Sequence, residues 1–168
     1  MSDDTEAKEP VKVISTPVVL DYTYSPGIAQ DRFLRAIKEG RMLGLGCEEC
    51  GRVYFPSRGS CPRCAKPTTK EVEVKDSGTV ITYCVVRVPS ANIEVELPYC
   101  AANILFDGAD ITTTLLVQGC PMEDIRIGMR VQAVWRPEAE WDYTLSNIDH
   151  VKPLDEPDVP FDEIKEYS

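Results

Sequence analysis

The sequence predicts a mainly β protein in which a helix and a metal-binding hairpin precede a small antiparallel barrel. Three observations predict this fold class. Four of the seven cysteines form two closely spaced pairs within residues 41–70. Short runs rich in β-branched and aromatic residues, separated by turn residues, then occupy residues 71–152. Only residues 26–40 carry the apolar spacing of an amphipathic helix.

The 168 residues divide into five parts by pattern and charge. We expect a flexible acidic arm (1–21), a helical segment (22–45), a zinc ribbon (46–70), a barrel (71–152) and an extended acidic tail (153–168). No apolar run approaches the roughly 20 residues that a membrane helix needs. The N-terminus is acidic and polar, unlike a signal peptide. We therefore expect a cytoplasmic protein without a membrane partner.

The helix prediction depends on residues 26–40. Pro26 suits the start of a helix, and Phe33, Leu34 and Ile37 share one face. Gly40 is a favourable residue just beyond a helix end. A single helix of this length is not stable alone, so it must pack on the next module or on a partner.

The strongest motif is Cys47-x-x-Cys50, ten residues, then Cys61-x-x-Cys64. Two tight turns of this kind, brought together by a hairpin, complete a tetrahedral four-sulfur shell around one Zn²⁺. Four such ligands leave no open coordination position, so the ion stabilises the fold and does not activate water. Iron is a minor alternative for the same ligands. The cysteine spacing and the acidic N-terminus argue against a disulfide framework.

The barrel prediction rests on six β-rich segments bounded by turn residues. In the segment 129–136, Val131, Ala133 and Trp135 alternate with polar residues, which places Trp135 on the barrel interior. Five or six strands without a long helix indicate a small closed barrel. The expected strands are 71–75, 79–88, 99–106, 111–118, 129–136 and 145–151.

Charge is unevenly distributed along a chain whose formal net charge is −10. Residues 41–70 hold six basic and two acidic side chains, and residues 153–168 hold one basic and six acidic ones. The simplest interpretation of the basic stretch is a well-solvated metal module. The functional alternative is a site for phosphate, which arginine binds well, at Arg41, Arg52 or Arg58.

The other candidates for chemistry are three scattered cysteines and the only histidine. Cys84 and Cys100 fall in expected strands, where a buried cysteine acts as a small apolar side chain. Cys120 lies in a turn. Nothing in the spacing pairs any of them with His150, which we expect at a strand end with a hydrogen-bond partner. Glu94 and Glu96 share a loop, where solvated charges are the commoner case.

The segment Cys47-x-x-Cys50-Gly-Arg-Val-Tyr-Phe-Pro-Ser-Arg58 up to Cys61-Pro-x-Cys64 is distinctive. With the later Ser-Gly-Thr-Val80 and Gly-Met-Arg-Val131, it resembles the zinc-ribbon OB-fold proteins of acyl-CoA metabolism, long filed as a domain of unknown function. The resemblance covers roughly residues 22–152. Two positions depart from the usual pattern: Ala65 stands where glycine is usual, and Ser57 where a second proline is common.

The resemblance implies a helical N-terminal hairpin, a rubredoxin-like zinc ribbon and a C-terminal OB-fold barrel of five to six antiparallel strands. It implies a non-catalytic accessory subunit that binds and stabilises a thiolase-like enzyme: a thiolase, a lipid-transfer-protein-type aldolase or a synthase of lipid, steroid or aromatic metabolism. The partner supplies the catalytic residues, and the small chain helps to hold acyl-CoA. On this view Arg41, Arg52 and Arg58 contact the CoA phosphates.

Two other functions compete with the accessory-subunit prediction. An OB barrel beside a zinc ribbon also suits a module for single-stranded nucleic acid. The net charge of −10 argues against that, because an acidic chain repels nucleic acid. A stand-alone thiol enzyme would use Cys84, Cys100 or Cys120, and rapid alkylation of one of them near neutral pH would favour it.

Overall fold

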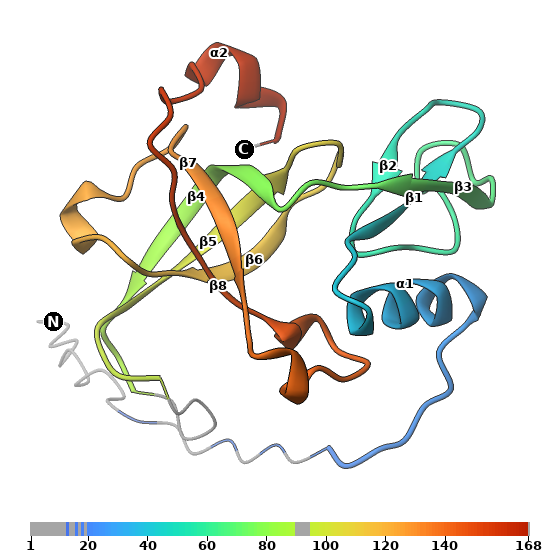
Figure 1. The fold of residues 1–168 in the computed structure, drawn as a ribbon, viewed down its shortest axis with the longest axis horizontal. Helices are drawn as coiled ribbons and strands as arrows, with labels where there is room; N and C mark the ends of the chain where they lie inside the picture. The colour runs from blue at the N-terminus through green and yellow to red at the C-terminus, as the bar shows by residue number, and fades with distance from the viewer. Residues whose placement is uncertain (1–12, 14–15, 17, 19, 90–94, 168) are drawn as a thin grey trace, which may run out of the picture.

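The computed structural model describes residues 13, 16, 18, 20–89 and 95–167. Most of the expected arm, and Glu94, therefore lie outside the described residues. A three-stranded sheet and a closed five-stranded barrel lie side by side, with one helix beneath the sheet (Figure 1). Among the described residues, no helix is long and apolar enough to cross a membrane.

Helix α1 (Ile28–Lys38) confirms the expected helix. It buries Phe33, Ala36 and Ile37, and the left-handed Gly40 ends it with a φ of 74°. The resemblance implied a helical hairpin here, but within residues 20–40 the structure has this one helix, preceded by extended chain. The β-favouring Tyr-Thr-Tyr sequence at 22–24 and Pro26 explain why no helix forms before it.

The ribbon sheet has the order β2-β1-β3, with both pairs antiparallel. Its strands are β1 (Leu43–Cys47), β2 (Val53–Tyr54) and β3 (Thr68–Glu73). Residues 71–73, expected to open the barrel, thus belong by pairing to the ribbon sheet. Strand β3 therefore crosses the boundary that we expected between residues 70 and 71. The division of the chain at that boundary stays a prediction.

The barrel has the closed order β4-β5-β6-β8-β7, and its five strands confirm the prediction of a barrel of five to six strands. Its one difference from an all-antiparallel barrel is the parallel contact of β6 with β8 at Val117 and Val151. That contact closes the barrel. It is parallel because β8, which runs antiparallel to β7, has the same direction as β6. The strands are β4 (Ser77–Val86), β5 (Tyr99–Phe106), β6 (Thr113–Val117), β7 (Arg130–Trp135) and β8 (Ile148–Pro153). Short 3₁₀ helices span Met122–Asp124, Glu138–Glu140 and Leu145–Asn147.

One apolar core joins the helix, the ribbon and the barrel. Phe55, which follows β2 and is fully buried, packs edge-on against Phe33 of α1 and Phe106 of β5, at centroid distances of 5.6 and 5.7 Å. The buried Asn147 adds a polar link, since its side-chain amide donates a hydrogen bond of 3.1 Å to the backbone carbonyl of Ile37. The helix is therefore held by barrel and ribbon together. Trp135 is only partly buried against this core, beside Trp141.

We expected an extended acidic tail, but the tail is extended only in part. It ends in the short helix α2 (Phe161–Ile164) and a 3₁₀ turn (Lys165–Tyr167), and Ile164 is buried. The prediction was wrong for residues 161–167, where a helical turn allows the apolar Ile164 to be buried. Residues 154–160 have no helix or strand, and arginines pair with them. Arg130 contacts Glu156 at 2.9 Å, and Arg126 makes two hydrogen bonds to Asp158.

Arg130 and Asp107 form the best-shielded ion pair of the barrel, with two hydrogen bonds of 2.7 and 2.8 Å. These bonds, and one from the Ser77 hydroxyl, lower the pKa of Asp107 below its usual value. A lowered folded-state pKa stabilises the fold above the unfolded-state pKa, and this contribution is lost as the pH falls.

Asp107→Asn is therefore expected to cost about 1–3 kcal/mol of unfolding free energy at pH 7, since the half-buried Arg130 keeps only the more exposed Glu156 as a charged partner. The difference from wild type should shrink below about pH 4, where the carboxyl of the unfolded wild type is protonated. Urea unfolding at both pH values measures this. The control Asp155→Asn removes an exposed carboxylate and should show no such dependence.

Candidate metal centre

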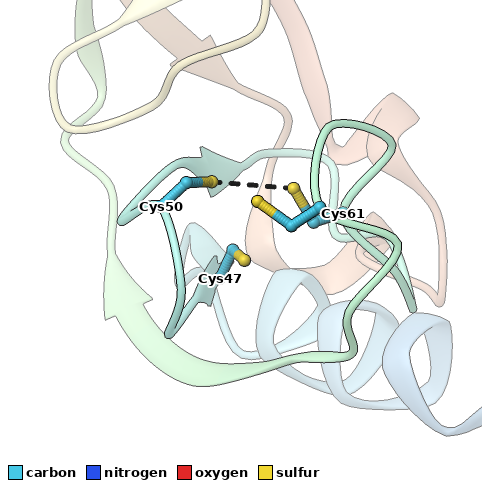
Figure 2. A group of neighbouring side chains, drawn as sticks. Cys47, Cys50 and Cys61 are labelled. Carbon is cyan, nitrogen blue, oxygen red and sulfur yellow. Dashed lines mark hydrogen bonds between the residues drawn. The ribbon is translucent and has the colours of Figure 1, made fainter.

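Four sulfur atoms converge at one end of the ribbon. The Sγ atoms of Cys47, Cys50, Cys61 and Cys64 all lie within 4.8 Å of one another. Figure 2 shows three of these side chains turned toward a common centre, with Cys50 and Cys61 3.7 Å apart. Zinc–sulfur bonds of about 2.3 Å in a tetrahedron place sulfurs about 3.8 Å apart, so the spacing fits zinc.

The two cysteine pairs sit on matching turns. In the first, the amide of Gly51 donates to the carbonyl of Cys47 at 2.8 Å; in the second, Ala65 donates to Cys61 at 2.8 Å. Gly51 and Ala65 both have a positive φ, of 75° and 52°. The usual turn is therefore kept although alanine replaces glycine in the second one.

Tyr54 supports the site from within the ribbon. Its hydroxyl, on a side chain only 2% exposed, lies 3.1 Å from the sulfur of Cys61. This hydrogen bond is the main cause that lowers the pKa of Cys61 to about 6, and the backbone amides of Cys64 and Arg63 add to it. The same contact raises the pKa of Tyr54 to about 12. Tyr54 thus acts as a hydrogen-bond donor to a thiolate ligand.

The neighbouring sulfurs have the opposite effect on Cys64. A hydrogen bond with Cys50, and then burial, raise the pKa of the Cys64 thiol to about 12. Without a cation, four thiols so close together cannot all ionise, because the negative charges repel one another. A divalent ion among them removes that repulsion. Sulfur donors in a tetrahedron select zinc, and the closed shell makes it a structural zinc site.

Ala65→Gly is expected to stabilise the ribbon by about 0.5–1 kcal/mol, because glycine adopts a positive φ without the strain of a side chain. The reverse change in the matching turn, Gly51→Ala, should destabilise by a similar amount. A Cβ at Gly51 meets nothing within 4 Å, so only backbone strain would act there. Thermal unfolding of the zinc-loaded variants measures both effects, and shifts of the same sign would contradict the explanation.

The structure separates the three arginines proposed to bind phosphate. Arg41 is engaged by Glu39 and Glu73 at 3.0 and 2.9 Å. Arg52 is half-buried beside the first cysteine turn. Arg58 is exposed and lines a groove between the N-terminus of α1 and the ribbon.

This groove has a volume of about 610 Å³. Its floor and walls include Ile28, Ala29, Leu45 and Pro67, and Arg32 joins Arg58 at its edge. Sequence reasoning missed Arg32, which looked like any residue on the polar face of the helix. Only the packing of α1 on the ribbon brings Arg32, which also pairs with Glu71 at 3.6 Å, into the lining of the same groove as Arg58.

The scattered cysteines occupy different environments. Cys100 is buried, and burial raises the pKa of its thiol. Burial likewise raises the pKa of Cys120. Cys84 is exposed, so the expectation of a buried apolar role is wrong for it. Cys84 lies on the outer face of β4, opposite Ala101 of β5, beyond a β-bulge between Val80 and Thr82 that shifts the alternation of the strand. His150 pairs with Asp149 at 2.8 Å, as expected of a satisfied histidine.

Known proteins share both the zinc ribbon and the barrel of this chain. Residues 35–69 match the family model of the ChsH2 rubredoxin-like zinc ribbon domain, and residues 71–136 match the ChsH2 C-terminal OB-fold domain. A DUF35 domain-containing scaffold protein of Methanocaldococcus jannaschii is 44% identical over 108 residues, which are 62% of this chain and 75% of the relative. The chain belongs to the DUF35 family.

A second DUF35 scaffold protein, from Pyrococcus furiosus, is 33% identical over 66% of this chain and 81% of its own length. Two solved structures share the fold at 21% identity. A DUF35 protein of unknown function from Sulfolobus solfataricus has a TM-score of 0.58, covering 76% of this chain and 87% of its own. An Ltp2-ChsH2(DUF35) aldolase has a TM-score of 0.57, covering 78% and 98%. The resemblance stated from the cysteine segment is therefore confirmed.

Proposed function

We propose that this DUF35 protein is a non-catalytic scaffold subunit that binds and stabilises a thiolase-like enzyme. The observation that carries the proposal is its similarity to curated scaffold proteins over three quarters of the length of one of them. A solved neighbour described as an Ltp2-ChsH2(DUF35) aldolase supports an aldolase-type enzyme as the partner class. The zinc ribbon then gives rigidity to a surface that another protein recognises.

The chemistry of the described side chains supports a scaffold. A four-sulfur shell offers the zinc no position for substrate or water. Burial raises the pKa values of the Cys100 and Cys120 thiols, which disfavours the nucleophilic thiolate. His150 is already engaged by Asp149.

Coexpression tests the proposal directly. We would coexpress the full chain with a thiolase-like protein encoded beside it and measure the mass of the purified complex by light scattering. A stable hetero-complex is expected, with thiolytic or aldol turnover in the complex and none in the isolated chain. Turnover by the isolated, zinc-loaded chain would overturn the scaffold role.

The groove beside α1 supports a contribution to acyl-CoA binding. Its apolar lining suits the pantetheine and acyl parts, and Arg58 and Arg32 at its edge suit phosphate. The first turn of α1 also borders it, with Gly27 as an N-cap that makes no side-chain hydrogen bond. The free amides there carry partial positive charge and favour an anion.

Arg58→Ala is expected to weaken CoA binding roughly tenfold, the loss of one charge-assisted hydrogen bond. Isothermal titration of the partner-bound chain with CoA measures it. Arg41→Ala is the control, because Arg41 is held by two carboxylates outside the groove. Pantetheine, which lacks phosphate, should bind wild type and Arg58→Ala alike. Equal CoA affinities for these two proteins would remove Arg58 from the proposal.

A further inference from the structure

The described chain before α1 carries a strand-like apolar pattern whose side chains stay mostly exposed, with Tyr24 at a small hollow that Phe33 and Tyr143 also line. Leu20, Tyr22 and Tyr24 alternate with Asp21 and Thr23, and Val18 lies two residues before Leu20, beyond the apolar Val19. We call Val18, Leu20, Tyr22 and Tyr24 the apolar row. They are 67%, 77%, 76% and 62% exposed. Residues 20–27 run as extended chain into α1, drawn in blue in Figure 1.

The alternation of apolar and polar residues over residues 20–24 is typical of a strand with one buried face. The rings of Tyr22 and Tyr24 are 6.2 Å apart, so they project from the same side of the extended chain. The conformation and side-chain placement are therefore those of a strand, but the partner sheet is missing. Four large apolar side chains kept in water are costly unless another surface covers them.

The described part of this chain offers that strand no suitable edge. The five barrel strands close on themselves and leave no edge. In the ribbon sheet, β2 has only two residues. The other edge, β3, exposes Glu71 and Glu73, which pair with Arg32 and Arg41. A charged edge of this kind opposes strand addition, so neither this chain nor a second copy supplies the acceptor.

We propose that the apolar row docks on a different protein by strand addition. That protein presents a free sheet edge, with an apolar pocket for every second side chain of the row. Basic side chains border the edge, because residues 1–25 carry five acidic and two basic groups. The identity of the acceptor rests on the proposed function: it is the thiolase-like subunit.

Two pairs of variants in the full chain test the proposal. Leu20→Ser/Tyr22→Ser shortens the apolar row, and Thr23→Ser/Ser25→Ala changes its polar face without changing its charge, as the control. Thr23→Pro removes a backbone N–H that strand addition uses, and Thr23→Ala retains it. Every substituted position is exposed and outside the core, so circular dichroism and thermal unfolding should match wild type.

Affinity for the purified thiolase-like subunit is then measured by interferometry. The double serine variant is expected to bind at least about 30-fold more weakly, as for two interface anchors, and Thr23→Pro at least about tenfold more weakly. Both controls should stay within about twofold of wild type.

Equal binding by wild type and all variants would overturn the proposal and leave the scaffold function intact. If even wild type fails to bind, both are overturned. Sedimentation of the isolated chain provides the remaining check. A dimer that the serine variant abolishes would assign the apolar row to a second copy and would also overturn the proposal.

Discussion

Cys61→Ser is expected to abolish zinc binding and to unfold the ribbon. Cys61 is fully buried and is the ligand that Tyr54 supports, so no nearby group replaces its sulfur. Zinc contributes about 10–16 kcal/mol to the folding of small zinc modules, which matches or exceeds the total stability of a typical domain. The ribbon contributes few large apolar side chains with which to fold alone, chiefly those of Leu43, Leu45, Tyr54 and Phe55.

Zinc content per chain and amide dispersion in residues 41–70 measure this effect. Wild type should hold one zinc, and the variant less than about a tenth of one, given the shared tetrahedral shell. Cys84→Ser is the control: it removes an exposed thiol outside the cage and should keep both zinc and fold. A folded ribbon in metal-free Cys61→Ser protein would contradict the structural role of the ion.

The zinc site could be predicted from sequence because its geometry is local. Two residues between paired cysteines fix the turn, and the turn itself supplies the convergence of the sulfurs. The alternation of Val131 and Ala133 with polar residues likewise predicts the buried face of a strand from neighbouring residues alone. The position of Arg58 in the same groove as Arg32, in contrast, depends on how α1 packs on the ribbon. No short-range pattern contains that information.

The tail shows a second limit of sequence reasoning. An acidic run with several prolines is typical of a solvated, extended segment, and taken alone the residues justify that interpretation. The partners that order it, Arg126 and Arg130, lie some 26–32 residues earlier in the chain. Pairing over such a separation follows from the antiparallel pairing of β7 with β8, which places Arg130 beside the first residues of the tail.

Phe55→Ala is expected to cost about 3–5 kcal/mol of unfolding free energy, the usual penalty for deleting a fully buried phenylalanine. The ring lies at the one point where all three parts of the structure meet: Phe33 of the helix and Phe106 of the barrel both pack edge-on against it. Its removal leaves a cavity that no single part can close, because each part is also fixed elsewhere. Asn147 holds the helix, and the zinc cage holds the ribbon.

Zinc content separates this effect from that of Cys61→Ser. Phe55→Ala should still bind one zinc per chain, because the four sulfurs and their turns are unchanged, while urea unfolding shows the lost stability. Phe161→Ala is the matched control: that ring is 56% exposed, and its loss should change stability by less than about 0.5 kcal/mol. A penalty for Phe55→Ala no larger than for Phe161→Ala would mean that helix, ribbon and barrel are held together without the shared aromatic core. The groove beside α1 would then have no rigid frame, since its two walls are the helix and the ribbon that Phe55 joins.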